Sequence, residues 1–383
     1  MVPHKRRVGV VLPNGPAYFT RVFAGIGAYC RGRHTWRFVA WPAFVLPLME
    51  LEQTIGAQQP DGIIGQASDS WEQMVAAGRV KFVNAEWSRR RHPLLPRAGC
   101  DEEAIGRLAA AHFQERAIRH LAAYGQHDSL PSTDRIAAFV EATKQSSSTT
   151  PPVRLAPTDG PDDPDALEAW IVSLPKPVGI FCWNDEAAKF VHQQCQSANL
   201  RIPEDVALLG VDNDETICHF LDPPLSSIDP NAQRVGYEAA ALLDRLMDGQ
   251  PAPDGPILVP PIGVVTRAST ELTAVDSPDV ARAIAYIRQH AGSTLTVEDV
   301  LDHLAISRRS LEKQFQAVLG RSPRSEIHRV LVARAHDLLA NTDLSIPTIA
   351  DRCGYSRANH FTTMFRKQTG QTPTAYRKQT RLG

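Results

Sequence analysis

The last hundred residues of this 383-residue chain contain the same short sequence pattern twice. One copy covers residues 296–323 and the other covers residues 346–373. Three pairs of residues recur fifty positions apart, namely Phe315 and Phe365, Gly320 and Gly370, and Pro323 and Pro373. A repeat of this regularity indicates a duplicated supersecondary unit. It constrains the fold more than any other feature, because both copies must form the same small structure.

The first copy predicts two short helices joined by a tight turn. Thr296 and Asp299 form a capping-box pattern at the start of the first helix, and the hydroxyl of Ser307 is placed to cap the second. Apolar residues at helical spacing give each helix an inward face: Val297, Val300, Leu301 and Leu304, then Leu311, Phe315, Val318 and Leu319. The outer face of the second helix is left polar and basic.

The second copy follows the same plan. Gly354 supplies a permissive turn, and Phe361, Met364 and Phe365 point inward. Two short helices that expose a polar, basic second helix form the helix-turn-helix layout, in which that helix enters the major groove of DNA. The candidate DNA-contacting residues lie on the outer faces of the two second helices: Arg308, Arg309, Lys313, Asn359, His360, Thr362, Thr363 and Arg366.

The distribution of charge favours this interpretation. From residue 276 onward the chain has sixteen Lys and Arg against ten Asp and Glu, whereas the residues before it have twenty-five against thirty-two. A basic tail joined to an acidic body is expected when one part of a protein contacts phosphates. The alternative is a helical bundle whose basic faces are only solvated. Two copies in register, with matched Ser, Phe, Gly and Pro, favour DNA binding.

The tail resembles the DNA-binding domain of the arabinose-regulator (AraC/XylS) family. Residues 327–339 look like the central connecting helix of that family, and residues 370–377 are close to its closing signature. The resemblance implies an all-α domain with two helix-turn-helix motifs on one connecting helix. Such a helix should place the two recognition helices in successive major-groove segments, about 34 Å apart.

The remainder of the chain alternates between short β-type runs and amphipathic segments. The predicted strands are residues 8–12, 37–41, 62–65, 80–84, 121–124, 153–155, 179–183 and 206–211, and the predicted helices are residues 17–30, 105–120, 166–173, 186–198 and 234–247. This alternation predicts a doubly wound α/β fold with parallel sheets. Because some 260 residues exceed one typical sheet, we expect two lobes. The expected division is residues 6–268, a linker over 269–278, and a tail domain over 279–383.

Several stretches of this α/β part resemble the effector domain of lactose-repressor relatives. They are residues 100–125, 133–139, 181–187, 202–213 and 223–228. The resemblance implies a two-lobed, periplasmic-binding-protein-like clamshell whose chain crosses between the lobes near residues 118, 229 and 253. Those relatives carry a helix-turn-helix before the clamshell, whereas here it follows. A clamshell followed by an arabinose-regulator tail is similar to the bacterial xylose operon regulators, and residues 257–270 are particularly close to theirs.

Candidate ligand-binding residues follow several of the predicted strands. Ligands of open α/β sheets bind beyond the carboxyl ends of the strands, and charged side chains form strong, directional hydrogen bonds with the hydroxyls of a polyol. The candidates from the second lobe are Arg135, Asp185 and Asp212, with Trp183 as an aromatic wall, and those from the first lobe are Asn14, Tyr18 and Phe19. The alternatives are that Asp212 caps a turn and that Trp183 belongs to the core.

Cofactors, metals and catalysis are not indicated. The six cysteines form no Cys-x-x-Cys pair, so neither a zinc site nor a disulfide scaffold is expected. No Gly-x-Gly-x-x-Gly follows a strand, and His112 and His120, eight positions apart on a predicted helix, are expected to be solvated. Asp185 and Asp212 could act as the acid and base of a glycosidase, but no hydrolase motif accompanies them. We therefore expect no enzyme.

No apolar run approaches the length needed to span a membrane, and the N-terminus lacks a secretory segment, so we expect a cytoplasmic protein. These features together predict a ligand-responsive transcription regulator that acts as a homodimer on double-stranded DNA. The resemblance favours a D-xylose-sensing activator, with RNA polymerase as a further partner. The alternatives are a sensor of another pentose or polyol, and a cytoplasmic sugar-binding protein or enzyme without DNA binding.

Overall fold

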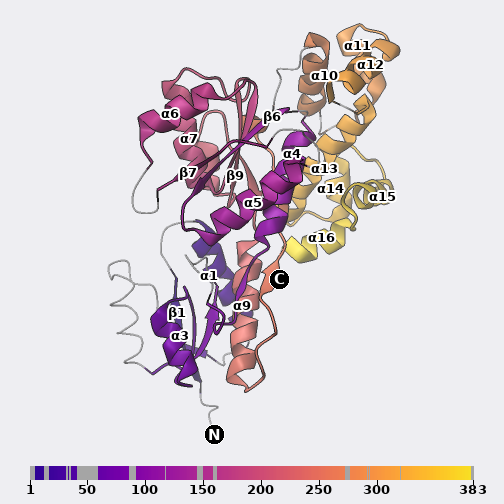
Figure 1. The fold of residues 1–383 in the computed structure, drawn as a ribbon. Coiled ribbons are helices and arrows are strands. Elements are labelled where there is room, and N and C mark those ends of the chain that lie inside the picture. Colours follow the sequence, from indigo (N-terminus) through magenta and orange to yellow (C-terminus); the bar gives the residue numbers. More distant parts are fainter. Residues whose placement is uncertain are drawn as a thin grey trace.

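The structure of the chain, a computed structural model, consists of two α/β lobes followed by an all-helical tail (Figure 1). It describes residues 5–12, 17–31, 33, 36–40, 59–85, 92–116, 118–144, 150–157, 162–271, 277–290, 292, 294–319 and 321–380. The predicted α/β clamshell and all-α domain are both present. Among the described residues, no helix combines the length and apolar character that crossing a membrane would require.

The first lobe is built on a parallel sheet in the order β2-β1-β3-β4. Its strands are β1 (Arg6–Val11), β2 (Trp36–Ala40), β3 (Gly62–Gly65) and β4 (Lys81–Asn84). The short strand β5 (Ala98–Cys100) follows β4 and pairs in parallel with β11 (Ile257–Val259). Helices α1 (Ala17–Cys30), α3 (Asp69–Ala76) and α9 (Ala232–Met247) complete this lobe.

The second lobe contains a six-stranded sheet in the order β12-β10-β9-β8-β6-β7, which is parallel except for β12. The strands are β6 (His120–Gln126), β7 (Val153–Ala156), β8 (Val178–Cys182), β9 (Val206–Val211), β10 (Ser226–Asp229) and β12 (Gly263–Val265). The helices are α4 (Glu102–Gln114), α5 (Leu130–Lys144), α6 (Pro164–Ser173), α7 (Asp185–Ser197) and α8 (Glu215–Phe220). Every residue of β8 and β9 is buried, as expected for parallel strands covered by helices on both faces.

The chain passes between the lobes three times, and two of the predicted positions were wrong. Strand β5 ends at Cys100, and α4 packs along α5 and β12 of the second lobe, so the first crossing lies at residue 101 rather than 118. The second lies between β10 and α9, near the predicted residue 229. The third occupies residues 260–262 rather than 253, because β11 pairs with β5 whereas β12 pairs with β10.

Helices α1 and α9 lie unusually close together at two glycines. A Cβ added to Gly25 would lie 1.9 Å from the carbonyl oxygen of Gln233, and one added to Gly236 would lie 1.9 Å from that of Val22. Only residues without a side chain permit this approach. Gly25 therefore serves helix packing.

The tail contains α10 (Pro278–Gln289), α11 (Val297–Leu304), α12 (Arg308–Leu319), α13 (Pro323–Asn341), α14 (Ile346–Arg352), α15 (Ala358–Thr369) and α16 (Pro373–Thr380). Two separate cores divide along the long helix α13. The first core includes Phe315 and Leu331, and the second includes Leu339 and Phe365. The two copies of the repeat are therefore two folded units that share one connecting helix, as predicted.

The junction of clamshell and tail departs from the predictions at three residues. Ser269 and Thr270 were expected in the linker, but both are fully buried in the second lobe. The hydroxyl of Ser269 donates to the carbonyl of Leu208 over 2.6 Å, so the folded clamshell extends beyond residue 268. His112 was expected to be solvated, but it is 4% exposed because this junction covers it. His120, which was predicted to lie on the same helix as His112, is exposed and begins strand β6.

Candidate functional site

A cavity lies between the two lobes, and side chains from both lobes line it. The first lobe contributes α1 and β5, while the second contributes the start of α4, helix α5 and the residues that follow β8 and β9. The lining residues are Tyr18, Phe19, Arg97, Gly99, Cys100, Glu102, Pro131, Arg135, Trp183, Asn184 and Asp212. Five predicted ligand-binding residues are among them: Tyr18, Phe19, Arg135, Trp183 and Asp212.

A buried ion pair forms one wall of the cavity. Arg135 Nε lies 2.5 Å from Glu102 Oε2, and Arg135 Nη1 donates to the carbonyl oxygen of Trp183 over 2.6 Å. The side chains of Arg135 and Glu102 are 5% and 9% exposed. Burial acts to lower the pKa of Arg135, but the neighbouring charges of Glu102 and Asp212 raise it above its usual value. The guanidinium therefore stays cationic and fixed in orientation beside the cavity.

Asp212 occupies the edge of the cavity at the carboxyl end of β9, as the strand prediction required. Its backbone φ is 109°, a value that residues other than glycine rarely adopt, and such conformations concentrate at functional sites. Arg267 braces the next residue by donating to Asn213 Oδ1 over 2.8 Å. Burial raises the pKa of the Asp212 carboxyl to about 7, against the opposing effect of the Arg135 and Arg21 charges. The carboxylate is thus poorly solvated and suited to accept hydrogen bonds from a ligand.

Aromatic residues supply the apolar surface of the cavity. The rings of Tyr18 and Phe19 meet edge to face with centroids 5.2 Å apart, and both side chains are largely buried. The Tyr18 hydroxyl lies 3.7 Å from Cys100 Sγ, which holds α1 against β5. Trp183 is only partly buried and lines the cavity from the second lobe. The cavity therefore combines charged groups with aromatic walls.

Asp185 was predicted to face the ligand, but it does not line this cavity. Its side chain is enclosed in the second lobe, where Oδ1 lies 2.7 Å from the hydroxyl of Ser227 and Oδ2 accepts from the backbone N–H of Asp214 over 2.8 Å. The preceding residue, Asn184, lines the cavity instead. Asn184 Oδ1 caps α7 by accepting from Ala187 N over 2.8 Å, so its amide nitrogen remains as a donor. Asn14, also predicted, lies outside the described residues.

Six lining residues were not predicted from the sequence: Arg97, Gly99, Cys100, Glu102, Pro131 and Asn184. Three of them belong to or precede β5, which is three residues long and has no alternating apolar pattern. Glu102 could have been suspected because Asp101, which caps α4 through Ala104 N, marks a helix start directly after that strand. The enclosed position of Asp185 also argues against the acid–base pair with Asp212, because only Asp212 reaches the cavity.

One group of described residues has the geometry to hold a metal ion, namely Asp69, Glu72 and His92. It lies outside the cavity. His92 Nδ1 is 3.1 Å from Glu72 Oε2, and Glu72 Oε1 accepts from the backbone N–H of Leu94 over 3.4 Å. These contacts fasten the chain that precedes β5 to helix α3, which accounts for the cluster structurally.

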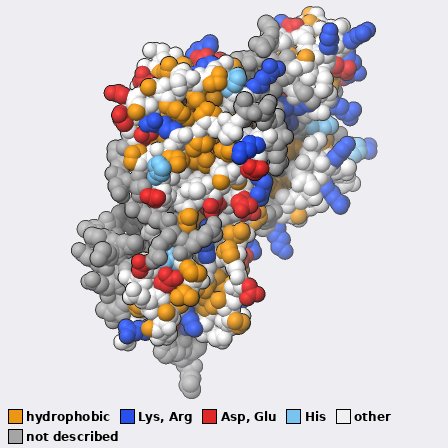
Figure 2. Space-filling model, in the orientation of Figure 1, with side chains coloured by type: hydrophobic (Ala, Val, Ile, Leu, Met, Phe, Trp, Pro, Cys, Tyr) orange, Lys and Arg blue, Asp and Glu red, His pale blue; other side chains and the backbone are white. Residues whose placement is uncertain are grey.

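The first candidate recognition helix, α12, exposes the predicted basic face. Arg308, Arg309 and Lys313 are exposed, whereas Leu311 and Phe315 are fully buried. Arg308 is ion-paired with Glu298 of α11 over 2.7 Å, so it is less available to DNA than its neighbours. Figure 2 shows Lys and Arg side chains projecting from the tail, at the upper right of that view. The predicted turn is also present, since Ala305 is left-handed and Ser307 Oγ accepts from Ser310 N.

The second candidate recognition helix, α15, repeats this arrangement. Asn359, His360, Thr363 and Arg366 are exposed and Thr362 is half-buried, while the inward residues Phe361, Met364 and Phe365 are buried. The turn before the helix contains Gly354 with a φ of 75°, as predicted. Both second helices of the repeat thus present the residues that the sequence predicted.

Comparison with known proteins supports both parts. Residues 110–270 match a family described as a periplasmic binding protein-like domain, and residues 300–379 match a helix-turn-helix domain family. The chain is 30% identical over 388 residues to the xylose operon regulatory protein of Escherichia coli strain K12, covering 98% of each chain. It is 29% identical over 382 residues to that of Haemophilus influenzae, covering 97% of this chain and 98% of the relative. Its structure resembles that of a xylose-binding transcription activator with a TM-score of 0.61, at 28% identity and 99% coverage of both chains.

Proposed function

This chain belongs to the family of xylose operon regulatory proteins, which are transcription regulators, and we propose that its effector is D-xylose, bound in the cavity between the two lobes. The observation that carries the proposal is the composition of that cavity. It combines ionic hydrogen-bonding groups with aromatic walls, as a compact molecule with many hydroxyls and an apolar ring face requires.

We assign complementary roles to the polar groups. The Asp212 carboxylate accepts hydrogen bonds from two adjacent hydroxyls, while Arg135 and the amide of Asn184 donate to sugar oxygens. Tyr18, Phe19 or Trp183 packs against the face of the ring. Asp185 has a supporting role, because its contacts with Ser227 and Asp214 hold the segments that flank Asp212. Another pentose or a small polyol would use the same groups and is the alternative effector.

Ligand contacts from both lobes favour a closed arrangement of the clamshell, because a sugar in the cavity contacts α1 and α5 at once. Closure would then change how the tail is presented to DNA. A ligand shifts such an equilibrium only by its difference in affinity for the two states. The regulator is therefore allosteric in our proposal, with sugar and DNA affinities linked.

For DNA, we propose that α12 and α15 enter successive major-groove segments of one duplex. Arg309 and Lys313 are the contacts of the first helix, and Asn359, Thr363 and Arg366 are those of the second. Thr362 and His360 lie at the edges of the second contact, and Arg308 acts mainly in its pair with Glu298. All of these side chains except the half-buried Thr362 are exposed on the sides of α12 and α15 opposite the buried faces, which supports the assignment.

The assembly and location follow from this function. We propose a homodimer, which would bind two half-sites, and an activator that contacts RNA polymerase at the promoter. A regulator must share a compartment with the DNA that it binds, so we propose that the protein is cytoplasmic. Catalytic activity forms no part of the proposal.

Calorimetric titration of the full chain with D-xylose, L-arabinose, D-ribose, xylitol and D-glucose tests the effector. We expect D-xylose to bind most tightly. Tighter binding of another pentose or of xylitol would identify that molecule as the effector. The assignment of the protein as a transcription regulator would remain. If none of the five binds while the folded protein still binds DNA, the assignment of the cavity to a sugar is wrong.

A further inference from the structure

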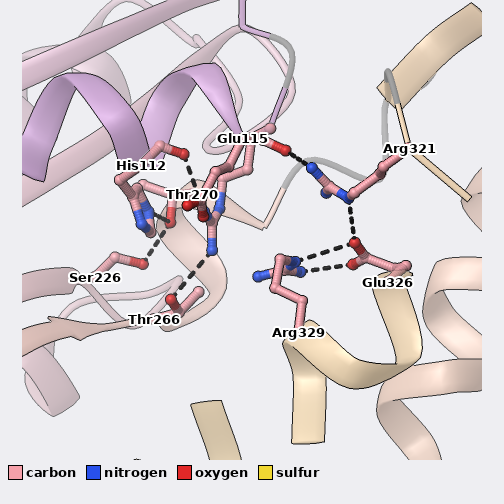
Figure 3. Close-up of polar contacts among 9 residues, drawn as sticks. His112, Glu115, Ser226, Thr266, Thr270, Arg321, Glu326 and Arg329 are labelled. Carbon is pink, nitrogen blue, oxygen red and sulfur yellow. Dashed lines mark hydrogen bonds and ion pairs between the residues drawn. The ribbon is translucent and has the colours of Figure 1, made fainter. Parts of the chain in front are cut away.

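The tail is fastened to the clamshell by a group of charged residues at the start of α13. Arg321, just before that helix, donates from Nη1 to the carbonyl oxygen of Glu115, the C-cap residue of α4 (Figure 3). The same guanidinium lies with its Nε 2.7 Å from Glu326 Oε2. Arg321 therefore joins the last turn of α4 in the clamshell to the first turns of α13 in the tail.

Glu326 holds this joint in one geometry. Its side chain is 1% exposed and also accepts two hydrogen bonds from Arg329, over 3.0 Å and 2.6 Å. Burial acts to raise the pKa of the Glu326 carboxyl, but the two arginines outweigh it and lower the pKa to about 2. The carboxylate is thus ionised at neutral pH with both oxygens engaged, and Arg321 is held in position to reach Glu115.

The same end of α4 also fixes the segment that leads into the linker. His112 Nε2 lies 2.9 Å from the hydroxyl of Thr270, which in turn lies 2.7 Å from the hydroxyl of Ser226 in β10. Arg116 bridges the carbonyl of His112 and the hydroxyl of Thr266, over 3.0 Å and 3.1 Å. Figure 3 shows these contacts beside the Arg321 group. The segment that leads into the linker and the hydrogen bond of Arg321 therefore meet at the C-terminal end of α4.

The opposite end of α4 lies in the ligand cavity. The first residue of the helix is Glu102, which lines the cavity and pairs with Arg135 of α5. A Cβ added to Gly106 would lie 2.2 Å from the carbonyl oxygen of Arg135, so α4 and α5 pack backbone to backbone and must move together. Thirteen residues of helix span about 20 Å. One rigid helix therefore connects the cavity with the tail.

We propose that helix α4 transmits ligand occupancy to the DNA-binding tail, with Glu102 as the residue that senses the ligand and the Arg321–Glu326–Arg329 group as the anchor on the tail. The inference rests on the proposed function, since it presumes a ligand in the cavity and DNA on the tail. A ligand that engages Glu102 and Arg135 displaces the start of α4. Because the helix is stiff, its C-terminal end moves with it and carries Arg321 and α13.

The test uses the full chain and three variants. Arg321→Ala removes the hydrogen bond that joins the anchor group to Glu115 at the end of α4. Arg321→Gln removes the charge but keeps most of the side-chain length, and it replaces the alanine variant if that variant does not fold. Arg107→Ala is the matched control, because Arg107 is an exposed arginine in the middle of α4 that, among the described residues, pairs with the exposed side chain of Glu103 and does not reach the anchor group. Circular dichroism and thermal melts verify folding.

The measurement is the affinity of each protein for a duplex selected by the wild-type protein from randomised DNA, with and without saturating D-xylose. We expect D-xylose to change the DNA affinity of the wild type and of Arg107→Ala by the same factor, at least fivefold. In Arg321→Ala or Arg321→Gln the factor should fall below twofold, while the affinity for D-xylose without DNA stays within threefold of the wild-type value.

If D-xylose changes the DNA affinity of a folded Arg321 variant by the same factor as that of the wild type, the proposal is overturned. The proposed function of the protein would still stand. An equal loss of coupling in Arg107→Ala also overturns it, because the effect would then not belong to the anchor. Absence of any binding of D-xylose or DNA by the wild type would instead contradict the proposed function, so the two failures are distinguishable.

Discussion

Glu102 Oε2 lies 2.5 Å from Arg135 Nε, and this pair joins the first turn of α4 to α5 within the wall of the ligand cavity. Both side chains are nearly excluded from bulk water. Charged groups held in this way keep one arrangement relative to each other when a polar ligand arrives, even where the two helices that carry them move as a unit. The cavity therefore suits the polyol that we propose as its ligand, and its behaviour can be tested residue by residue.

Asp212→Ala should remove the main hydrogen-bond acceptor for the sugar. Loss of a desolvated, hydrogen-bonded charge costs about 2–5 kcal/mol of binding free energy, which corresponds to a D-xylose affinity at least ~30-fold weaker. Calorimetry measures the affinity, and the rise in melting temperature with D-xylose should shrink in parallel. Asp254→Ala, at an exposed loop position, is the matched control. Wild-type affinity in a folded Asp212→Ala protein would remove this residue from the binding site.

The affinity for D-xylose should depend on pH through Asp212. In the ligand-free protein burial raises its pKa to about 7, opposed by Arg135 and Arg21. Sugar hydroxyls that donate to the carboxylate favour its ionised form, so binding lowers the pKa and releases a proton below pH 7. Affinity should therefore increase as the pH rises from 5.5 to about 7, by up to tenfold per pH unit, and then level off. Titrations at several pH values measure this.

The control for the pH dependence is Asp212→Asn, in which the titrating group is absent and the profile should be flat between pH 5.5 and 8. Affinity that instead falls as the pH rises would mean that the protonated carboxyl donates to the sugar, and the assigned role of Asp212 would be reversed.

Substitution of Asp185 should lower the stability of the fold more than it weakens ligand binding. Burial raises the pKa of the Asp185 carboxyl well above its usual range, and the nearby charge of Asp212 raises it further, so the protonated form is favoured. Asp185→Asn should keep the contacts with Ser227 and Asp214 and melt within a few degrees of the wild type. Asp185→Ala leaves those buried groups unpaired, at about 1–3 kcal/mol of unfolding free energy. Thermal unfolding distinguishes the two, and a normal melt for Asp185→Ala would contradict this account.

Two substitutions should change DNA sequence preference at different places. Arg309→Ala on α12 should relax preference at one end of the half-site, at about 1–3 kcal/mol if Arg309 contacts a base. Asn359→Ala on α15 should do so about ten base pairs away, because the two helices occupy successive major-groove segments. Selection from randomised duplexes measures both, with Arg282→Ala on α10 as the control. Loss of preference at the same base pairs in both variants would rule out the two-groove arrangement.

The two helix-turn-helix units of the tail and their connecting helix could be predicted from sequence, because their signals are local, whereas helices α10 and α16 were not predicted. Thr296 and Asp299 form the expected capping box, and Phe315 and Phe365 are buried at matching positions of the two units. A helix-turn-helix consists of short-range contacts, so caps, turns and apolar spacing specify it. Strands β1 to β4 and β6 to β9 of the clamshell were located for a similar reason, since buried parallel strands are short apolar runs, whereas the short strands β5, β10, β11 and β12 were not predicted.

The ligand cavity could be predicted only in part. Strand ends indicated Asp212 correctly, but adjacent residues at a strand end point in different directions, and Asn184 rather than Asp185 lines the cavity. Glu102 and Cys100 were missed because a three-residue strand gives no periodic signal. The burial of His112 depends on residues 266–270, which are more than 150 positions away, so no local pattern could reveal it.

Sugar binding and DNA binding are linked within one chain in our proposal, and reciprocal titration tests this linkage most directly. The affinity for D-xylose is measured with and without the selected duplex, and the affinity for the duplex is measured with and without D-xylose. Linkage requires both ratios to be equal. We predict the same factor in both directions, at least fivefold. Tight binding of both ligands with ratios of one would show that the protein does not respond to D-xylose through its DNA-binding tail.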